Sequence, residues 1–290
     1  SHLIGLFSRT TSFMEKGLKL VFVFDGKPPE LKNKTLENRT AIKNQALLKL
    51  EKARLEDDLA SVKKYSARVD KLDLEMIEDA KELISALGLP IIQAPSEGEA
   101  QATHLVKRGD AYATVSQDYD NLIFGSLLLI RNLSLEGRRK QKGVMAFSKI
   151  KPELISLSET LKKNSIDLDQ LIILAIIIGT DYNPGGIKGL GPKKALKLIH
   201  EYKKDFTKLF VDIKWPEHFP DLKWQEIYDT IVNMPVSDDY SLVWQQFDES
   251  RLRELLIDRF EFSVERVESQ LNRLKDGQKS LSQKGLNSFF

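Results

Sequence analysis

Four carboxylates fall within residues 90–125, a stretch whose pattern predicts a strand, a helix and a second strand. They are Glu97, Glu99, Asp118 and Asp120. In an α/β sheet, ligands bind outside the carboxyl ends of parallel strands, and these acids follow two such ends. Two unit charges about 4 Å apart repel by roughly 4 kcal/mol at an effective dielectric near 20, so a cation among the carboxylates would stabilise them. Oxygen ligands alone favour Mg²⁺ or Mn²⁺, although acidic capping of helix N-termini is the alternative interpretation.

The helix between the two strands must bring its two glutamates to one site. Ser96 is predicted to cap that helix, with Glu99 completing a capping box. Residues two apart on a regular helix point about 200° apart, so Glu97 and Glu99 share a site only if the first turn is irregular, which Gly98 permits. The two aspartates follow a strand predicted over residues 111–115, and they share one face if that strand extends through them. Further predicted elements are strands at residues 127–131 and 144–147 and a helix at 151–161.

Two further acids are predicted at the ends of buried elements. Residues 18–24, LKLVFVF, form a near-continuous apolar run typical of a buried parallel strand, and Asp25 follows directly. A helix predicted over residues 167–178 is apolar around most of its circumference and leads to Asp181. Each acid also has an ordinary structural explanation, because an Asx-Gly turn commonly follows a strand and Asp181 could be a loop aspartate.

Residues 185–202, GGIKGLGPKKALKLIHEY, have the sequence form of a helix-hairpin-helix. Gly189 and Gly191 flank a single leucine, and Pro192 follows at a helix start. Such a hairpin directs backbone N–H groups and a helix N-terminus at a phosphate without reading bases. Positive charge is added there by Lys188, Lys193 and Lys194. A tight turn between two helices is the alternative interpretation.

Residues 27–72 show no strand pattern and carry twelve Lys or Arg against seven Asp or Glu. Helices are predicted over residues 36–59 and 73–87. A mostly polar insertion between two buried elements suggests an arch or lid over the site, although a solvated helix of mixed charge would have the same pattern. The basic residues nearest the strand that ends at Asp25 are Lys32, Lys34, Arg39 and Lys43.

Length and composition narrow the class of protein. The 290 residues suffice for one large α/β domain or two smaller ones, and the net charge is only +2. The absence of cysteine excludes disulfides, thiolate zinc sites and cysteine nucleophiles. No apolar run reaches the length of a membrane span, so we expect an intracellular protein without a membrane partner.

From Asp276 onward the composition turns to Gln, Ser, Lys and Gly, which predicts a flexible tail over residues 276–290. This tail nevertheless ends in the sequence QKGLNSFF. Two phenylalanines at the end of a flexible tail have no intramolecular core to enter, so we expect them to bind a pocket on a partner protein.

Taken together, these motifs resemble those of the flap endonuclease family of structure-specific nucleases, in its archaeal and eukaryotic branch. The matching segments are VFVFDGKPPELK, APSEGEA, SQDYDNLIFG, IGTDYNPGGIKGLGPKKAL and QKGLNSFF. The resemblance implies an α/β fold in which helices flank a mostly parallel central sheet, the PIN-like 5′ nuclease domain. That nuclease core would span residues 1–275, with a helical arch at 27–72 and the helix-hairpin-helix at 179–202. Excision-repair and exonuclease branches share the acids and the hairpin, but the arch length and the tail favour flap endonuclease.

The resemblance also assigns roles to individual residues. The family binds two divalent ions, Mg²⁺ or alternatively Mn²⁺, and six of its seven carboxylate positions are matched by Asp25, Glu97, Glu99, Asp118, Asp120 and Asp181. The catalytic basic pair that contacts the scissile phosphate is matched by Lys32 and Arg39. DNA-binding positions are matched by Arg9, Glu97, Gly179, Asp181, Gly189, Gly191, Lys193 and Lys194. A potassium ion is a further expected cofactor at the hairpin. The box that binds the sliding clamp, proliferating cell nuclear antigen, is matched by Gln283, Leu286, Phe289 and Phe290.

The implied activity is hydrolysis of DNA phosphodiesters at branched DNA with a 5′ flap, by a two-metal mechanism and in-line displacement. Threading a single strand under the arch would give end specificity. Accompanying 5′–3′ exonuclease activity and roles in DNA replication and repair also follow from the resemblance. The expected location is the nucleus in a eukaryote, or the cytoplasm and nucleoid in an archaeon.

The family carries about sixty residues before the point that matches Ser1, long enough for a strand with its crossover helix and bearing the seventh carboxylate. We therefore expect the sequence to be incomplete at its start. The alternative is a catalytically impaired, clamp-tethered protein that binds branched DNA because the first metal-ligand segment is absent. An acidic-pocket phosphotransfer domain, such as a phosphatase, is a third and less favoured class.

Overall fold

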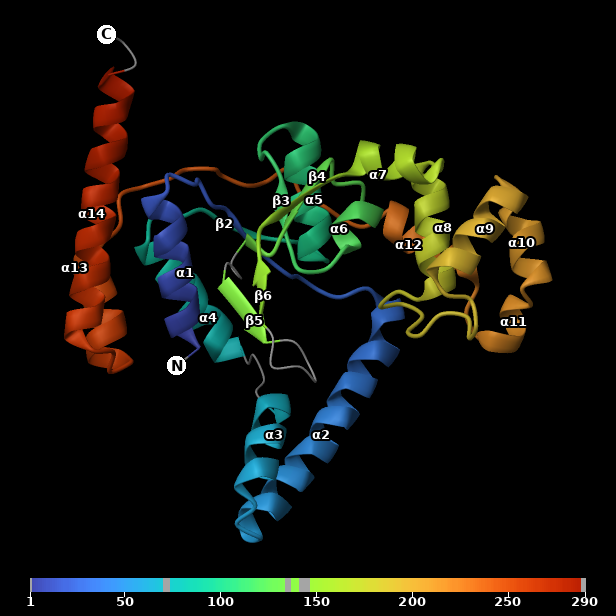
Figure 1. The fold of residues 1–290 in the computed structure, drawn as a ribbon, viewed down its shortest axis with the longest axis horizontal. Helices are drawn as coiled ribbons and strands as arrows, with labels where there is room; N and C mark the ends of the chain where they lie inside the picture. The colour runs from blue at the N-terminus through green and yellow to red at the C-terminus, as the bar shows by residue number, and fades with distance from the viewer. Residues whose placement is uncertain (1, 70–73, 134–136, 141–146, 288–290) are drawn as a thin grey trace. The chain divides into compact units, whose positions relative to one another are not determined.

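The chain folds into two compact units in the computed structural model, which describes residues 2–69, 74–133, 137–140 and 147–287 (Figure 1). The first unit comprises Ser1–Phe24, Lys71–Gln93 and Asp238–Phe290, and the second comprises Asp25–Asp70 and Ala94–Ser237. All six carboxylates predicted to bind metal therefore belong to the second unit. Within the described residues, none of the helices is both long and apolar enough to cross a membrane.

The first unit combines two short strands with helices from both ends of the chain and one internal helix. Strand β1 (Phe22–Phe24) runs parallel to β2 (Ile91–Gln93). The helices are α1 (Leu3–Glu15), α4 (Leu74–Ala86), α13 (Glu249–Arg253) with a π-helical continuation (Glu254–Arg259), and α14 (Val264–Asn287). Helices α1 and α14 pack against each other, and Gln270 donates a hydrogen bond of 2.7 Å to Oγ1 of Thr11.

Apolar side chains from these helices fill one core, in which Leu3, Leu83 and Leu271 are fully buried. Two elements of this unit differ from the prediction. Strand β1 occupies only the last three residues of the apolar run 18–24, because only those residues pair with β2. Helix α14 continues to Asn287, where the composition predicts a flexible tail from Asp276, since Lys, Gln and Leu are good helix formers.

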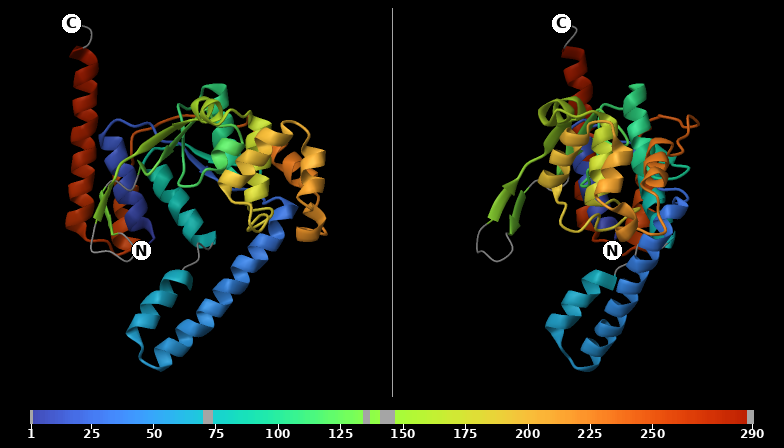
Figure 2. Two further views of the ribbon diagram at one scale, coloured as in Figure 1. Left: turned by 45° about the vertical axis from the view of Figure 1, so that its right-hand side comes forward. Right: turned by 90° about the vertical axis from the view of Figure 1, so that its right-hand side faces the viewer.

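In the second unit, two helices form a hairpin where the arch is predicted. They are α2 (Asn33–Leu55), which follows a short 3₁₀ turn (Glu30–Lys32), and α3 (Leu59–Val69), and they pack side by side (Figure 2). Ala46, Leu50 and Ala53 of α2 are buried, whereas Leu48 and Leu55 are 68% and 88% exposed. The hairpin therefore buries only a narrow apolar strip, as the mostly polar sequence of residues 27–72 indicates.

The second unit also contains a three-stranded sheet. Strand β3 (Thr114–Val115) is parallel to β4 (Leu128–Arg131), which is antiparallel to β7 (Glu153–Ser156). Strands β5 (Gly137–Lys140) and β6 (Phe147–Ile150) form a separate antiparallel ribbon. The helix predicted over 151–161 starts late, at α7 (Leu157–Asn164), because the residues before it pair with β4. The strand predicted at 144–147 lies mostly outside the described residues.

The remaining helices of the second unit surround an isoleucine-rich core. They are α5 (Gly98–Arg108), α6 (Asp120–Ile123), α8 (Leu168–Ile178), α9 (Pro192–Tyr202), α10 (Phe206–Asp212), α11 (Trp215–His218) and α12 (Trp224–Val232). Asp167 and Gln170 form a capping box at the start of α8, and Ile173, Ile176 and Ile177 of that helix are fully buried. The buried helix is therefore confirmed, and parallel strand pairs with surrounding helices confirm the α/β fold class.

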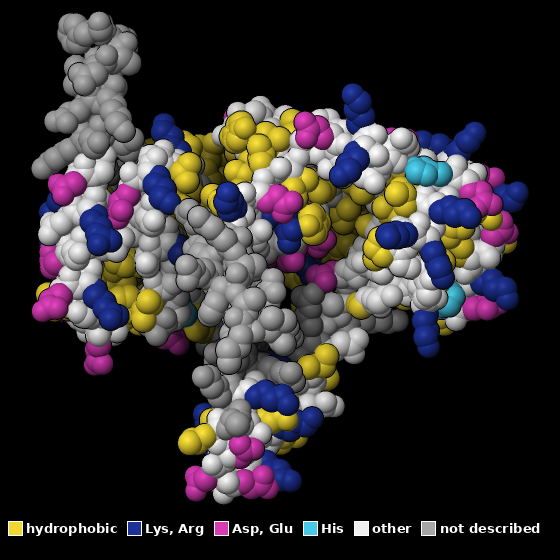
Figure 3. Space-filling model, in the orientation of Figure 1, with side chains coloured by type: hydrophobic (Ala, Val, Ile, Leu, Met, Phe, Trp, Pro, Cys, Tyr) yellow, Lys and Arg dark blue, Asp and Glu magenta, His cyan; other side chains and the backbone are white. Residues whose placement is uncertain are grey.

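The helices after α8 carry a mixed surface charge. Over α9–α11, Lys and Arg side chains lie among Asp and Glu side chains on the face shown in Figure 3. This mixture agrees with the small net charge of the whole chain, so any nucleic-acid contact here must come from locally placed groups rather than from a uniformly basic surface.

Candidate metal centre and nucleic-acid interface

The helix start that carries the two glutamates is anchored by Asp25. Oδ1 of Asp25 accepts a hydrogen bond of 2.7 Å from the backbone N–H of Gly98, the first residue of α5. Ser96 does not cap that helix, contrary to the prediction, because its hydroxyl donates to the backbone carbonyl of Lys27 at 2.9 Å. The carboxylate that bonds to the helix N-terminus thus comes from 73 residues away, which local spacing does not reveal.

The irregular turn that the two glutamates require is present. Glu97 precedes the helix in an extended conformation, with φ −71° and ψ 124°, whereas Glu99 lies in the first helical turn. Glu97 is buried and Glu99 is partly buried. Because only Glu99 has helical geometry, the two side chains are not forced to opposite faces of α5, and their two-residue spacing is compatible with one site.

Asp118 and Asp120 lie in a turn held by Ser116 rather than in a continued strand. Strand β3 ends at Val115, and Asp120 opens α6. The Ser116 hydroxyl accepts a hydrogen bond from the Asp118 backbone N–H at 3.1 Å and donates one to Oε1 of Glu99 at 3.0 Å. Ser116 therefore links the aspartate turn to the glutamate helix, a role that its sequence position alone does not indicate.

Asn121 and Arg131 brace the same turn. Nδ2 of the buried Asn121 donates to the backbone carbonyl of Glu99 at 3.1 Å. Nε of Arg131 donates to the Gln117 carbonyl at 2.9 Å. The Arg131 guanidinium also stacks 4.0 Å from the centre of the Tyr119 ring and bonds the Tyr119 hydroxyl. Asn121 is a typical turn residue, which is a weak sequence signal, but the Arg131 contact depends on β4 and has no local signal.

Asp181 is placed by a loop that turns sharply after α8. Gly179 has φ +117°, and a Cβ at this position would lie 2.6 Å from the backbone nitrogen of Gly186. Oδ1 of Asn183 accepts hydrogen bonds from both the backbone N–H and the hydroxyl of Thr180. The fold itself requires glycine at position 179, so its presence is not independent support for a DNA contact there.

Lys32 lies among the acids and pairs with two of them. Its Nζ is 2.9 and 2.8 Å from Oε1 and Oε2 of Glu97, and 3.2 Å from Oδ2 of Asp181. Burial alone would lower the pKa of Lys32, but hydrogen bonds and the charges of Glu97 and Asp181 raise that pKa above its ordinary value. Nearby, the Thr35 hydroxyl donates to the backbone carbonyl of Asp181. These contacts fix the start of α2 at the acids.

Negative charge accumulates around the other acids. The pKa of Glu99 rises to about 7, first because the side chain is buried and then because neighbouring carboxylates, Asp120 foremost, repel its charge. The pKa of Asp120 is also raised, first by lost hydration, although its side chain reaches solvent, and then by Asp181 and Asp118. A divalent cation would relieve this repulsion, and a donor set made of carboxylate oxygens suits Mg²⁺ or Mn²⁺.

The acids lie close enough for their charges to interact, but in the described part of the structure they do not form a complete metal coordination sphere. Among the described residues, no three Asp, Glu or His side chains are arranged to hold one metal ion. Five of the acids interact electrostatically. The charges of Glu97 and Asp118 contribute to the raised pKa of both Glu99 and Asp120, Asp120 contributes to that of Glu99, and Asp181 contributes to that of Asp120. Asp25 bonds to the start of α5 instead, and the Lys32 ammonium stands between Glu97 and Asp181.

The glycine hairpin leaves its backbone open to a ligand. A Cβ added at Gly189 or Gly191 would meet no atom within 4 Å, so packing does not require glycine at either position. Gly189 has φ +89°, which favours glycine, but Gly191 has an ordinary φ of −76°. Gly191 is the N-cap of α9 and has no side chain to cap it, and Lys193 and Lys194 are exposed in the first turn. These features fit a helix N-terminus that binds phosphate.

The other predicted residues are only partly described. Arg9 is exposed on α1 in the first unit. The backbones of Arg39, Gln283 and Leu286 lie in helices α2 and α14, but their side chains lie outside the described part of the structure. Phe289 and Phe290 lie outside the described residues.

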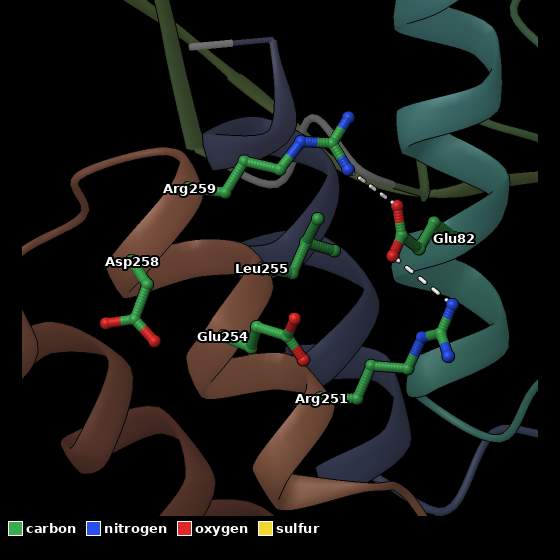
Figure 4. A pocket seen from close by; sticks show the side chains of 6 residues that line it. All are labelled: Glu82, Arg251, Glu254, Leu255, Asp258 and Arg259. Carbon is green, nitrogen blue, oxygen red and sulfur yellow. Dashed lines mark hydrogen bonds and ion pairs between the residues drawn. The ribbon is translucent and has the colours of Figure 1, made fainter.

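A pocket in the first unit gathers charged residues that no motif singles out. It has a volume of about 270 Å³ and is lined by Glu82, Arg251, Glu254, Leu255, Asp258 and Arg259 (Figure 4). Arg251 and Arg259 both pair with Glu82, at 3.3 and 2.9 Å, and Arg259 also pairs with Asp79. Because its cations are already paired with these acids, the pocket offers little net charge to a ligand.

Comparisons with known sequences cover most of the chain. The family models of the XPG N-terminal domain and the XPG I-region match residues 1–46 and 88–181. Flap endonuclease 1 of Pyrococcus abyssi is 47% identical over 290 residues, which cover 100% of the chain and 82% of that relative. Flap endonuclease 1 of Staphylothermus marinus is 48% identical over 274 residues, which cover 94% of the chain and 77% of the relative.

Solved structures give the same grouping. Flap endonuclease-1 from Methanococcus jannaschii has a TM-score of 0.68 at 38% identity, covering 94% of the chain and 80% of that structure. The catalytic core of Rad2 in complex with DNA substrate has a TM-score of 0.69 at 25% identity, covering 94% of the chain and 83% of that structure. Sequence and structural similarity therefore extend over both units of the chain.

Proposed function

The chain belongs to the flap endonuclease 1 family, and on that premise we propose that the carboxylates around Lys32 are the site at which it cuts flapped DNA. The chain is a structure-specific flap endonuclease, a metal-dependent hydrolase that acts on DNA. The observation that carries the location of the site is the partly buried cluster of acids, in which burial and then repulsion from neighbouring carboxylates raise the pKa of Glu99 to about 7. Shifts of this size cluster at functional sites.

The proposed metal ligands are Asp25, Glu97, Glu99, Asp118, Asp120 and Asp181. Two Mg²⁺ ions bound there, or Mn²⁺ in their place, would supply a hydroxide nucleophile and stabilise the leaving oxygen. The protein contributes the placement of these oxygens. Asp25 holds the first N–H of α5, and Ser116 ties Glu99 to the aspartate turn, so both pairs of acids are oriented before an ion arrives.

Lys32 and Arg39 are proposed to act on the scissile phosphate. The ammonium of Lys32 lies among the carboxylates, so a phosphate bound at the ions would come within its reach. A positive charge at that point stabilises the negative charge that develops on the phosphate oxygens. Arg39 is proposed to share this role because it matches the second position of the family's basic pair.

DNA backbone contacts are proposed at the glycine hairpin, through Gly189, Gly191, Lys193 and Lys194, with K⁺ as an additional ion. Backbone N–H groups and lysines contact phosphates rather than base edges, so recognition depends on DNA shape and not on sequence. Further DNA contacts are proposed at Arg9, Glu97, Gly179 and Asp181. The helical hairpin of α2 and α3 is proposed as the arch over the single-stranded flap.

The terminal segment with Gln283, Leu286, Phe289 and Phe290 is proposed to bind the sliding clamp. Two adjacent phenylalanines offer apolar side chains that fit a hydrophobic pocket on a partner. An enzyme of DNA replication and repair works where the DNA is, so the proposed location is intracellular.

Replacement of one metal ligand tests the proposed site. Asp118→Ala should lower Mg²⁺-dependent cleavage of a 5′-flap substrate by at least about a thousandfold, because an ion loses a ligand whose charge it needs. Binding of the same flap, measured in EDTA by fluorescence anisotropy, should change by less than about threefold.

Asp221→Ala serves as the matched control, because Asp221 is exposed on the loop before α12 and outside the acid cluster. It should cleave at the wild-type rate. Wild-type cleavage that persists undiminished in EDTA, or an active Asp118→Ala variant, would place the chemistry elsewhere.

A further inference from the structure

The Lys32 ammonium is held at the acids by two hydrogen bonds and an ion pair. An ammonium has three hydrogens to donate. Three carboxylate oxygens accept from it or lie within ion-pair distance, two on Glu97 at 2.9 and 2.8 Å and one on Asp181 at 3.2 Å. In this arrangement the ammonium donates to Glu97 and pairs with Asp181. The lysine proposed to contact the scissile phosphate is therefore occupied by the acids.

The Lys32 ammonium lies between two of the carboxylates proposed as metal ligands, Glu97 and Asp181. The Lys32 side chain is only 16% exposed, and the side chain of Glu97 only 10%. A carboxylate buried to that degree requires a positive charge beside it, because an unpaired buried charge is strongly destabilising. In the absence of divalent ions, Lys32 supplies that charge.

We propose, resting on the function proposed above, that Lys32 is an internal counter-ion that a divalent metal must displace from Glu97 and Asp181. The exchange has two consequences. The two carboxylates pass from the ammonium to the ion, so the lysine opposes ion binding at these oxygens. The released ammonium regains its donors, so an ion at this position makes Lys32 available for the phosphate of the DNA.

The competition can be measured without DNA and therefore without turnover. Mn²⁺ is titrated into the metal-free full chain, and the free ion is followed by electron paramagnetic resonance. Lys32→Met keeps an unbranched side chain of similar length but removes the charge, so the variant should bind Mn²⁺ roughly tenfold more tightly, as expected for the loss of charge-assisted bonds that compete with the ion. A role limited to phosphate contact leaves the Mn²⁺ affinity unchanged.

Lys27→Met is the matched control, because Lys27 is exposed in the same unit and pairs with no acid among the described residues. Its Mn²⁺ affinity should stay within about twofold of wild type, since an exposed charge is screened by solvent. Equal tightening in both variants would mean that net charge, and not the position of Lys32, sets the affinity.

A second measurement uses the unmodified chain and does not depend on the folding of a variant. The rate of Lys32 acetylation by an amine-reactive reagent is followed by peptide mass spectrometry, with Lys27 as the internal reference. Without ions Lys32 should react several-fold more slowly than Lys27, because its side chain is mostly buried and its ammonium is engaged by the two acids. Saturating Mn²⁺ should raise the Lys32 rate while leaving the Lys27 rate unchanged.

The outcomes separate this inference from the proposed function. If wild type cleaves flaps but Lys32→Met binds Mn²⁺ no more tightly, or if Mn²⁺ leaves the Lys32 acetylation rate unchanged, the counter-ion role is wrong while the nuclease site stands. If Mn²⁺ displaces Lys32 as expected but no Mg²⁺-dependent flap cleavage occurs, the counter-ion role stands and the proposed function fails.

Discussion

Five of the six proposed metal ligands divide into two groups that differ in how their charge is balanced. Glu97 and Asp181 share the ammonium of Lys32. Glu99, Asp118 and Asp120 form no ion pair with lysine or arginine among the described side chains, although the charge of Lys32 acts to lower the pKa of Asp120. Burial, followed by repulsion from neighbouring carboxylates, raises the pKa of Glu99 to about 7. We call the first the compensated pair and the second the uncompensated trio.

The difference indicates the order in which ions should bind. An ion that enters the uncompensated trio relieves repulsion and displaces nothing. An ion that enters the compensated pair must first separate an ammonium from two carboxylates, which opposes its binding. The trio should therefore provide the tighter site, and the pair should provide the site linked to release of Lys32.

The largest stability effect is expected from Glu99→Gln in the metal-free protein. The folded state raises the pKa of Glu99 from 4.5 to about 7, so it binds more protons than the unfolded state between these values. Stability from this group is therefore present below pH 4.5 and lost as pH rises through 7. At pH 8 in EDTA, Glu99→Gln should be more stable than wild type by on the order of 2 kcal/mol.

Urea unfolding at pH 8 and at pH 5 checks this prediction, because most of the gain should vanish at pH 5, where Glu99 is protonated in the wild type. Glu201→Gln, an exposed glutamate on α9, is the control and should show no gain at either pH. A gain of equal size at both pH values would show that it arises from packing rather than from charge.

Glu97→Gln should have the opposite sign. This change removes the negative charge that pairs with Lys32, so the metal-free protein loses two short charge-assisted hydrogen bonds. The expected destabilisation is about 1–2 kcal/mol in EDTA, measured by the same urea unfolding. Stabilisation by both Glu97→Gln and Glu99→Gln would remove the distinction between the compensated pair and the uncompensated trio.

A smaller effect on Mn²⁺ affinity is expected from Arg131, which contacts the turn that carries Asp118 and Asp120 rather than the carboxylates themselves. Arg131→Met removes the hydrogen bond to Gln117 and the stacking on Tyr119, so Asp118 and Asp120 should lose part of their fixed orientation. Mn²⁺ affinity should fall about tenfold, the lower end of the range for groups that orient metal ligands.

Arg131→Lys keeps the charge but not the planar donor geometry, and it should recover only part of the affinity. Full recovery by lysine would assign the effect to charge alone, and an unchanged affinity in Arg131→Met would show that the turn needs no brace.

Much of the fold follows from local sequence patterns. The apolar circumference of residues 167–178 predicts the buried helix α8. Helix α5 ends at Gly109, whose φ of +80° favours glycine. The elements that differ do so for long-range reasons. Ser96 bonds to a carbonyl 69 residues away instead of capping α5, and β7 is a strand because β4 lies beside it.

In the candidate site, too, some features follow from local sequence and others depend on long-range contacts. The types and positions of its six acids are visible in the sequence because each lies at the end of a strand, helix or turn. The division of five of them into a compensated pair and an uncompensated trio is not visible, since Lys32 is 65 residues from Glu97 in sequence. Neither spacing nor composition reveals which acid receives a counter-ion, because that depends on how α2 meets the loop after α8.

The most direct test of this division is a Mn²⁺ titration of the metal-free chain, compared between Glu99→Gln and Glu97→Gln. If this division is correct, the tighter Mn²⁺ site of the wild type disappears in Glu99→Gln and survives in Glu97→Gln. A tighter site that survives in Glu99→Gln and disappears in Glu97→Gln would contradict it.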